Sequence, residues 1–555
     1  MNKKVCSFLI LFALLALLIG TCAVVFPASA QAAPTSTGSI TVSGTVARSY
    51  DAYQIFNANV VDGDSDAKIA TDLAWASDAV RDAALPVLHS AGMPNSQTTA
   101  QEAAEWLNTD SHLTSALSAQ LARSLQSSGA VSVALNAGTA AELPCGYWLI
   151  VADDDAIAQN EAGTAPIMAL VGGNAVTVKP KAATPKVAKH VLEDSTAAWQ
   201  KAADATVADD LYWRLSATVP AGLAAYDTYT VKFVDTMSAG LDPSKVAASM
   251  HVYVAAGADG GFDAVSTGKD GRAGTEPAKG WTDITAQCAT KVAADGTFTV
   301  RTGDLIAALG GADAFTAGAR VVAVYNAPLN SACNHGIAKG NPNEVYLRYP
   351  RSPFADQSGD AGFTRTPSDD ACAYTWDFAL TKRGSDGDKP LAGAVLSIAD
   401  DRGRTLAADG TWDAEAKATV TTGEDGRVTV SGVDSGKLEV RELKAPKGYT
   451  AFEGTRSVTV KAEGLDVDQV AAAKPKLTIT AESPLRADSA DGSTGSLEAS
   501  LINAPTGTPP SITTGGFMPS TGDMAMYAAA AAAVAGAALI VVALLVKRGG
   551  GSHKE

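Results

Sequence analysis

The sequence has 555 residues, of which 46% are hydrophobic and 18% charged, and it carries a formal net charge of −16. At roughly 100 to 200 residues per domain, this length predicts several domains with enough apolar side chains to fill their cores. The acidic balance argues against nucleic-acid binding, because phosphate contacts depend on lysine and arginine.

The first 32 residues are typical of a secretory signal peptide. A basic start precedes the apolar run Phe8–Val25, and small residues follow at alternate positions. We expect cleavage after Ala30 or Ala32, so the mature chain is secreted.

Residues 33–181 mix helical and strand patterns and are expected to form an α+β N-terminal domain. Thr99 to Glu102 read Thr-Ala-Gln-Glu, which is a capping-box pattern for the start of a helix. Four leucines recur at helical spacing and are expected in a core: Leu113, Leu117, Leu121 and Leu125. Two prolines in residues 179–185 predict a short, stiff linker after this domain.

From residue 182 the helical signal fades, and alternating strands separated by Gly-rich turns predict a mainly β chain. We expect tandem immunoglobulin-like β-sandwiches over residues 182–355 and 371–505. A polar stretch connects these two domains. Residues 506–523 begin with a segment that is rich in Thr, Pro and Gly, and this composition predicts an extended spacer.

Strand phase places polar and ionisable residues on the core face of the 182–355 domain. Residues two apart in a strand share one face, and Lys189, Asp235 and Asn343 are each in phase with apolar neighbours. Asn341 is a rival for the amide position, and Asn330 is a more distant one.

The 371–505 domain repeats the pattern. Lys382 is in phase with three apolar side chains of its strand, Glu442 with two, and Asn503 with three. An amine, a carboxyl and an amide are therefore expected to point into one apolar interior.

Burial of these groups favours a particular reaction. Isolated buried charges are unfavourable, and desolvation lowers the pKa of a lysine and raises that of a carboxyl. A neutral Lys382 amine can then attack the side-chain carbonyl of Asn503. Protonated Glu442 polarises that carbonyl and passes a proton to the departing ammonia. The product is a Lys–Asn isopeptide bond, and Lys189, Asp235 and Asn343 are expected to form a second bond with Asp235 as the acid.

The last domain also carries sequence motifs of a known family. Residues 421–430 and 438–442 resemble the collagen-adhesin B-type domain, and Glu442 to Tyr449 match the E box, Glu-x-x-Ala-Pro-x-Gly-Tyr, of Gram-positive pilins. The whole chain resembles a sortase-assembled backbone pilin. This resemblance implies the same isopeptide assignment, with Asp in place of Glu in the central domain as in many pilins.

The C-terminal end resembles the sorting signal of Gram-positive surface proteins. The motif is Met518, Pro519, Ser520, Thr521 and Gly522, with Met518 in place of the usual Leu. An uncharged apolar run over residues 524–546 is long enough to cross a bilayer, and the basic tail 547–555 is expected on its cytoplasmic side. The resemblance implies that a sortase cleaves after Thr521 and discards the transient membrane anchor.

A lysine of the next subunit must resolve the acyl-enzyme formed on Thr521. Family pilins use the lysine of a Tyr-Pro-Lys pattern, and here Lys179-Pro180-Lys181 departs from it at the first position. We expect Lys181 to be the linking residue, with Lys179 and Lys186 as alternatives.

Four cysteines remain after signal removal: Cys145, Cys288, Cys333 and Cys372. In an oxidising exterior they are disulfide candidates with three alternative pairings. The six histidines show no metal-ligand spacing, so no metal and no cofactor are expected, and no enzymatic constellation presents itself.

These observations predict a structural subunit of a covalent pilus shaft in the wall of a Gram-positive bacterium. The expected partners are a sortase, identical subunits in a linear polymer, peptidoglycan and a host surface ligand. The alternative is a singly wall-anchored adhesin or minor pilin built from the same modules.

Overall fold

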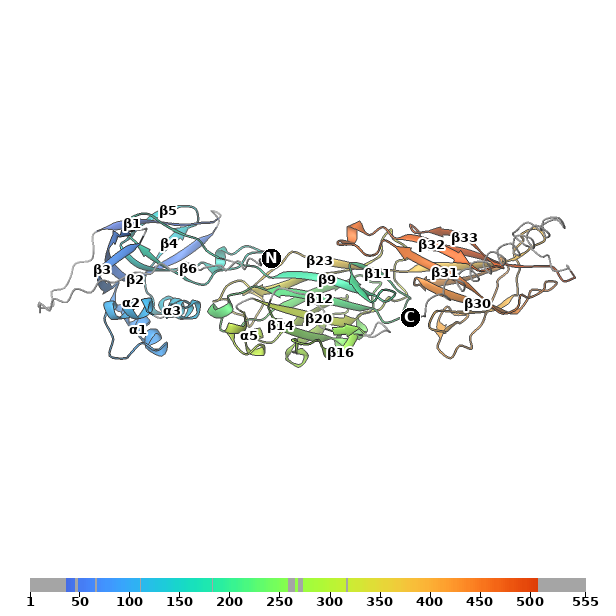
Figure 1. Ribbon diagram of the computed structural model, residues 1–555, viewed down its shortest axis with the longest axis horizontal. Coiled ribbons are helices and arrows are strands. Elements are labelled where there is room, and N and C mark those ends of the chain that lie inside the picture. Colours follow the sequence, from blue (N-terminus) through green and yellow to red (C-terminus); the bar gives the residue numbers. More distant parts are fainter. Residues whose placement is uncertain are drawn as a thin grey trace, which may run out of the picture.

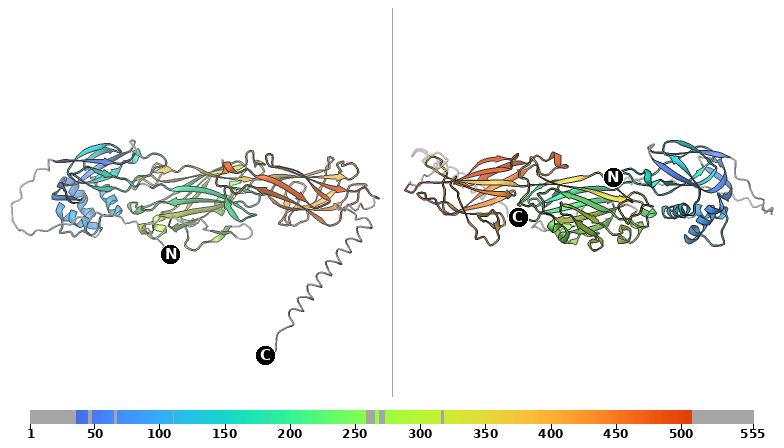
Figure 2. Two further views of the ribbon diagram at one scale, coloured as in Figure 1. Left: turned by 45° about the horizontal axis from the view of Figure 1, so that its top comes forward. Right: turned by 180° about the vertical axis from the view of Figure 1, so that it is seen from behind.

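The computed structural model describes residues 36–44, 48–64, 67–109, 111–181, 183–257, 265–267, 273–315 and 318–507. Three domains follow one another along its long axis, with the N-terminal domain (blue) at one end and the C-terminal domain (orange) at the other (Figure 1). Two further views show the same linear order (Figure 2). In the described part of the chain, no helix is both long and apolar enough to cross a membrane. The expected signal peptide, sorting signal and apolar run 524–546 lie outside the described residues.

The N-terminal domain packs a five-stranded sheet between three helices and a smaller sheet. The larger sheet has the order β3 (Lys68–Trp75), β2 (Ser49–Asp62), β6 (Gly146–Ala152), β7 (Ile167–Val171), with β4 (Ser132–Asn136) paired to β2. The smaller sheet has the order β5 (Ala140–Pro144), β1 (Thr37–Val42), β8 (Val176–Val178). The helices are α1 (Asp78–Ser90), α2 (Ala100–Asn108) and α3 (Ser115–Ser128). Alternation along β2 directs Tyr50 and Ala52 to one core, and Tyr53 and Ile55 to another that includes helix residues.

The helix signals in this domain are largely confirmed. Thr99 caps α2 and makes the reciprocal capping box with Glu102. The last three of the four periodic leucines are buried on α3. The prediction is wrong for Leu113, which is 37% exposed, because α3 begins only after Thr114, its N-cap.

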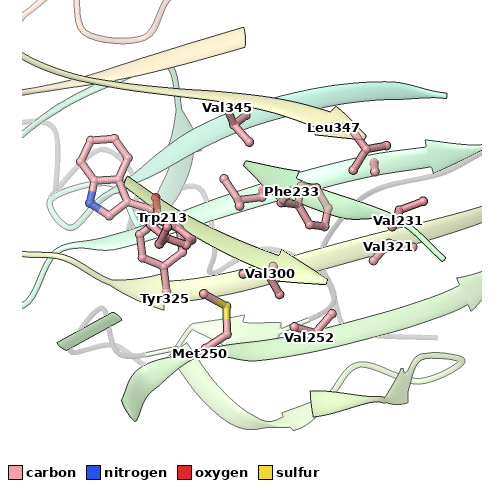
Figure 3. Close-up of a cluster of buried hydrophobic side chains, with 14 of the residues drawn as sticks. Trp213, Val231, Phe233, Met250, Val252, Val300, Val321, Tyr325, Val345 and Leu347 are labelled. Atoms are coloured by element: carbon pink, nitrogen blue, oxygen red, sulfur yellow. The ribbon is translucent and has the colours of Figure 1, made fainter. Parts of the chain in front are cut away.

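The central domain is a sandwich of two sheets. Its first sheet has the order β10 (Ala198–Gln200), β9 (Lys186–Glu193), β12 (Tyr212–Val219), β20 (Ala319–Asn326), β14 (His251–Ala256), β17 (Thr282–Asp283). Its second sheet has the order β11 (Ala202–Asp204), β23 (Asp369–Tyr374), β21 (Asn341–Pro350), β13 (Lys232–Met237), β19 (Thr297–Arg301), β18 (Ala289–Val292), with β22 (Phe363–Arg365) paired to β21. A hairpin, β15 (Val265–Thr267) and β16 (Ala273–Pro277), and the short helices α4 (Val246–Ser249) and α5 (Leu305–Ala308) complete it. Side chains of both sheets, including Trp213, Phe233, Tyr325 and Leu347, meet in one core (Figure 3).

The C-terminal domain is a second sandwich. One sheet has the order β29 (Arg427–Val433), β24 (Trp376–Gly384), β34 (Ser496–Asn503), β33 (Leu485–Asp491). The other has the order β27 (Trp412–Asp413), β26 (Thr405–Leu406), β25 (Val395–Ala399), β30 (Gly436–Lys444), β31 (Thr455–Glu463), β32 (Lys476–Ala481), with β28 (Val420–Thr421) paired to β25. The first and last strands of the domain, β24 and β34, pair in parallel.

The border between the two sandwiches differs from the sequence-based expectation. Residues 356–370 were expected as a connection and residue 371 as the start of the last domain. Instead β22 and β23 belong to the second sheet of the central domain, where β23 pairs with β21 and β11. The border therefore lies at Thr375, between β23 and β24.

Candidate functional site

The three residues expected to react in the central domain meet inside its sandwich. Lys189 lies on β9 of the first sheet, whereas Asp235 and Asn343 lie on the adjacent strands β13 and β21 of the second sheet. All three are 0% exposed. Strand phase therefore predicted their burial correctly, and sandwich packing brings the lysine opposite the carboxyl and the amide.

The hydroxyl of Tyr325 connects these groups. Lys189 Nζ forms an ion pair with Asp235 Oδ2 and donates a hydrogen bond to Tyr325 OH at 2.8 Å. Tyr325 OH donates to Asp235 Oδ2 at 3.2 Å, and Asn343 Nδ2 donates to Tyr325 OH at 2.8 Å. Within the described residues, Asp235 Oδ1 and Asn343 Oδ1 have no hydrogen-bond partner. The cluster is thus compact and holds two free acceptor oxygens.

Burial moves the pKa values of the amine and the acid toward each other. Desolvation lowers the pKa of Lys189 to about 8, although the Asp235 carboxylate opposes this shift. Desolvation raises the pKa of Asp235 to about 6, against the influence of Lys189. The ion pair and its neutral tautomer, in which the proton has passed from amine to acid, are thereby brought closer in energy.

The rival amides are engaged elsewhere. Asn341 is also fully buried, but its Oδ1 accepts from Asn334 N at 2.8 Å and its Nδ2 donates to two backbone carbonyls. Asn330 Nδ2 donates to Ala239 O at 2.9 Å in a surface turn. Of the three asparagines, Asn343 is the one that contacts the Lys189 cluster.

The C-terminal domain brings its three expected residues together in a different way. Lys382 on β24 and Asn503 at the end of β34 lie on neighbouring parallel strands, while Glu442 reaches them from β30 of the facing sheet. The Lys382 and Glu442 side chains are both 0% exposed, and Asn503 is 2% exposed. The three groups therefore share one dry interior.

Glu442 occupies the middle of this second cluster. Asn503 Nδ2 donates to both Glu442 carboxylate oxygens, at 2.8 and 2.9 Å, and Lys382 Nζ lies 3.9 Å from Glu442 Oε1. Lys382 Nζ also donates to Leu501 O at 3.1 Å, and Phe452 N donates to Glu442 Oε2 at 3.1 Å. Asn503 Oδ1 has no hydrogen-bond partner in the described part of the chain. A rotation of the amide exchanges its nitrogen and oxygen, which brings the carbonyl oxygen of Asn503 to the Glu442 carboxyl.

This arrangement can perform amide exchange. Desolvation lowers the pKa of Lys382 to about 8, opposed by Glu442, so a neutral amine is accessible near neutral pH. A neutral amine is a nucleophile, and a carboxyl beside the amide can polarise the carbonyl and shuttle the proton. Both clusters therefore hold an amine, an amide and an acid in a water-excluded core.

Three residues around the central cluster were not predicted from the sequence. Tyr325 is in phase with the core-facing Val321 and Ala323, so its position was detectable, because a buried tyrosine hydroxyl needs a polar partner. Lys201 and Asp369 form an ion pair beside Lys189, where Lys201 Nζ donates to the Lys189 carbonyl at 2.9 Å. No local sequence signal marks this last contact, because its residues come from different strands.

Lys179 and Lys181 lie between β8 and β9, in the connection from the N-terminal to the central domain, and Lys186 is the first residue of β9. Lys179, Lys181 and Lys186 are all exposed. Their accessibility does not distinguish among them, and Thr521 lies outside the described residues.

None of the three possible disulfide pairings is present, because all four cysteines are free. Cys145 lies in the N-terminal domain, apart from the other three. Cys288 Sγ donates to a backbone carbonyl at 3.3 Å, and Cys333 Sγ contacts His335 Nε2 at 3.6 Å. Cys372 is buried on β23, where desolvation raises the pKa of its thiol to about 11. Each thiol is held in its own environment.

Most of the C-terminal sandwich matches a known protein family. The family described as SpaA, prealbumin-like fold domain, matches residues 377–474. Residues 377–474 are therefore similar to that family. The match to the SpaA domain includes Lys382 and Glu442 and ends before the strand that carries Asn503.

A curated relative and several solved structures are also similar to this chain. The trypsin-resistant surface T6 protein of Streptococcus pyogenes serotype M6 is 30% identical over 143 residues, which cover 24% of this chain and 24% of that protein. The chain therefore matches only about a quarter of that relative's length. The T6 backbone pilin structure of serotype M6 S. pyogenes is 17% identical, with a TM-score of 0.45, over 85% of this chain and 99% of that one. The full-length major pilin SpaD of Corynebacterium diphtheriae is 14% identical, with a TM-score of 0.41, over 86% and 100%.

Proposed function

We propose that this protein is the shaft subunit of a covalent pilus on the wall of a Gram-positive bacterium. Identical copies are joined in a line, each through Thr521 to Lys181 of the next, by a sortase that acts on the signal at residues 518–522. The completed polymer is attached to peptidoglycan. The protein has a structural role, and it closes its own internal cross-links.

The observation that carries this proposal is the pair of buried Lys–acid–Asn clusters in consecutive sandwiches. A fibre one molecule thick bears its load through every domain, so each domain must resist unfolding under tension. An isopeptide bond from Lys189 to Asn343 or from Lys382 to Asn503 prevents separation of the strands that it joins. A match to the SpaA family at residues 377–474 and the likeness to a trypsin-resistant surface protein support the same conclusion.

The positions of the two joining segments suit end-to-end polymerisation. Lys181 lies before the central sandwich and is exposed, and the spacer with Thr521 follows the C-terminal sandwich. The load between one junction and the next therefore passes through both cross-linked sandwiches of the rod (Figure 1).

The polymer is tested by the ladder of covalent multimers in detergent-boiled wall extracts. Lys181→Arg keeps the charge but removes the nucleophile, because a guanidinium stays protonated. We expect the ladder to collapse to a monomer in this variant and to persist in Lys179→Arg and Lys186→Arg. Persistence in Lys181→Arg would transfer the role to one of the other two lysines. A wild-type protein that is wall-linked at a single size would instead support the singly anchored adhesin or minor pilin.

The internal bonds are tested by intact mass. Each bond releases one ammonia molecule, so the mass of the wild-type chain should be lower than its sequence mass by two ammonia molecules. Glu442→Ala should raise the mass by one ammonia molecule, because only the bond between Lys189 and Asn343 still forms. Asp235→Ala should also raise the mass by one ammonia molecule, because only the bond between Lys382 and Asn503 still forms. A folded wild-type protein with its full sequence mass would contradict both bonds.

A further inference from the structure

Tyr325 contacts both nitrogen atoms that exchange a proton in the central cluster. Its hydroxyl lies 2.8 Å from Lys189 Nζ, the attacking amine, and 2.8 Å from Asn343 Nδ2, the nitrogen that leaves. The same oxygen donates to Asp235 Oδ2 at 3.2 Å. A hydroxyl is both donor and acceptor, so it can serve all three groups at once.

We propose that Tyr325 is a catalytic residue of the central bond, and that its hydroxyl passes the proton from the Lys189 amine to the departing ammonia of Asn343. This role rests on the proposed isopeptide bond and adds a fourth residue to the cluster. As the Nζ–Cγ bond forms, Nζ loses one proton, and as the Cγ–Nδ2 bond breaks, Nδ2 gains one and leaves as ammonia. Tyr325 gives its proton to Nδ2, takes one from Nζ and ends unchanged, while Asp235 polarises the carbonyl.

The two clusters differ in the reach of their carboxyl groups, and this difference explains why the central cluster needs the Tyr325 hydroxyl and the C-terminal cluster does not. In the C-terminal cluster, both Glu442 oxygens accept from Asn503 Nδ2, and Oε1 is 3.9 Å from Lys382 Nζ, so one carboxyl lies beside both nitrogens. Aspartate is one methylene shorter. The contact that the structure shows between Asp235 and Asn343 runs through the Tyr325 hydroxyl.

The fold holds the Tyr325 ring in place for this task. Tyr325 is 0% exposed and lies on β20, opposite Trp213 of β12. Phe298 packs edge-on against the ring at a centroid distance of 4.8 Å, and Lys189 Nζ lies 5.4 Å from the ring centroid. Because these contacts involve the ring rather than the hydroxyl, Tyr325→Phe should preserve them.

The experiment follows closure of each bond separately in the full chain. Protein recovered unfolded and uncross-linked is refolded in mild detergent, and samples taken over time are analysed by intact mass and by mapping of the Lys189–Asn343 and Lys382–Asn503 peptides. In Tyr325→Phe we expect the central bond to close about 10²-fold more slowly, which is at the lower end of general acid–base effects. The C-terminal bond should close at the wild-type rate and serves as the internal reference. Tyr349→Phe removes a buried hydroxyl of the same domain that contacts Glu161 O, and it should leave both rates unchanged.

The outcomes separate this inference from the proposed function. If wild-type protein forms no central bond, the proposed function fails in that domain, and the role of Tyr325 fails with it. If wild type closes the central bond and Tyr325→Phe closes it equally fast, the role of Tyr325 alone is overturned.

A second replacement covers the case in which Tyr325→Phe does not fold. Incorporation of a ring-fluorinated tyrosine at position 325 keeps the shape and the hydroxyl but makes the phenol more acidic. A proton relay predicts an altered rate of central closure with this residue. A hydroxyl that only fills space predicts the wild-type rate, and that result would overturn the proposal.

Discussion

At the scale of single residues, the two buried lysines reach similar acidity in different surroundings. Burial lowers the pKa of both Lys189 and Lys382 to about 8. Lys189 forms an ion pair with Asp235 and bonds to a tyrosine hydroxyl, whereas Lys382 bonds to a backbone carbonyl with its carboxyl farther away. The desolvated core therefore sets the acidity of the amine, and the neighbours set the route of the proton.

Closure of the central bond should depend on pH as a broad bell. The reaction needs neutral Lys189, with a pKa of about 8, and protonated Asp235, with a pKa of about 6. The rate follows the product of the neutral fraction of Lys189 and the protonated fraction of Asp235. Between pH 6 and pH 8 the two fractions change in opposite directions and their product stays constant, so we expect a plateau there. Below pH 6 the product falls with the neutral fraction of the amine, and above pH 8 it falls with the protonated fraction of the acid. Refolding a Glu442→Ala chain across a pH series, with intact mass as the readout, isolates this bond. A rate that still rises above pH 9 would contradict the need for a protonated acid.

At the scale of elements, the two proposed bonds fasten different pairs of strands. The Lys382–Asn503 bond joins β24 to β34, which are hydrogen-bonded neighbours in one sheet. The Lys189–Asn343 bond joins β9 to β21, which belong to opposite sheets. The first bond therefore stops the terminal strands of a domain from sliding apart, and the second stops the two layers of a sandwich from opening.

Removal of the C-terminal bond should destabilise that domain strongly. Lys382→Met deletes the nucleophile without burying a new charge. By analogy with a disulfide, the cross-link closes a loop on the order of 100 residues, which contributes about 4–5 kcal/mol through the entropy of the unfolded chain. We expect a lower unfolding temperature and faster cleavage by trypsin. Lys437→Met changes an exposed lysine of the same domain and should behave like wild type. Equal protease resistance of the two variants would show that the bond does not stabilise the domain.

At the scale of the whole molecule, direct contacts join each domain to the next. Arg123 of α3 donates to Asp227 at 3.0 Å and to the carbonyl of Pro353 at 3.3 Å, across the first junction. At the second junction, Arg404 of the C-terminal domain binds Asp209 of the central domain at 2.5 and 2.7 Å. These bonds join successive domains, which follow one another in a line (Figure 2).

The second junction also contains carboxyl groups that titrate in an unusual range. Burial, with the nearby Asp204, raises the pKa of Glu193 from 4.5 to about 8 and raises that of Asp434 well above its ordinary value. Asp204 accepts a hydrogen bond from Trp376 Nε1 at 2.6 Å, so the group joins the central domain to the first strand of the next.

Replacing Glu193 should alter how stability depends on pH. A raised pKa means that the folded state binds the proton more tightly than the unfolded state, so this contribution to stability is lost as pH rises from about 4.5 to about 8. Glu193→Gln cannot lose a proton. We expect its unfolding temperature, measured relative to wild type by calorimetry, to increase between pH 5 and pH 8 and to level off between pH 8 and pH 9. A constant difference over this range would mean that Glu193 does not titrate there.

Local sequence pattern was sufficient for much of the fold and the candidate site. The capping box at Thr99 and the change from helical to strand periodicity near residue 182 depend only on neighbours in the chain. The burial of Lys382, Glu442 and Asn503 follows from the two-residue repeat of a strand, which is also local.

Only the tertiary structure decided which of these buried groups meet. Asn341 and Asn343 have the same strand phase and the same burial, so no local pattern separates them. The packing of one sheet on the other brings Asn343 to the Tyr325 hydroxyl and leaves Asn341 with backbone partners. Pairing of β23 with β21, rather than composition, sets the domain border at Thr375. Phase is a property of a single strand, whereas contacts across a sandwich depend on how distant segments pack, and that information is not local in the chain.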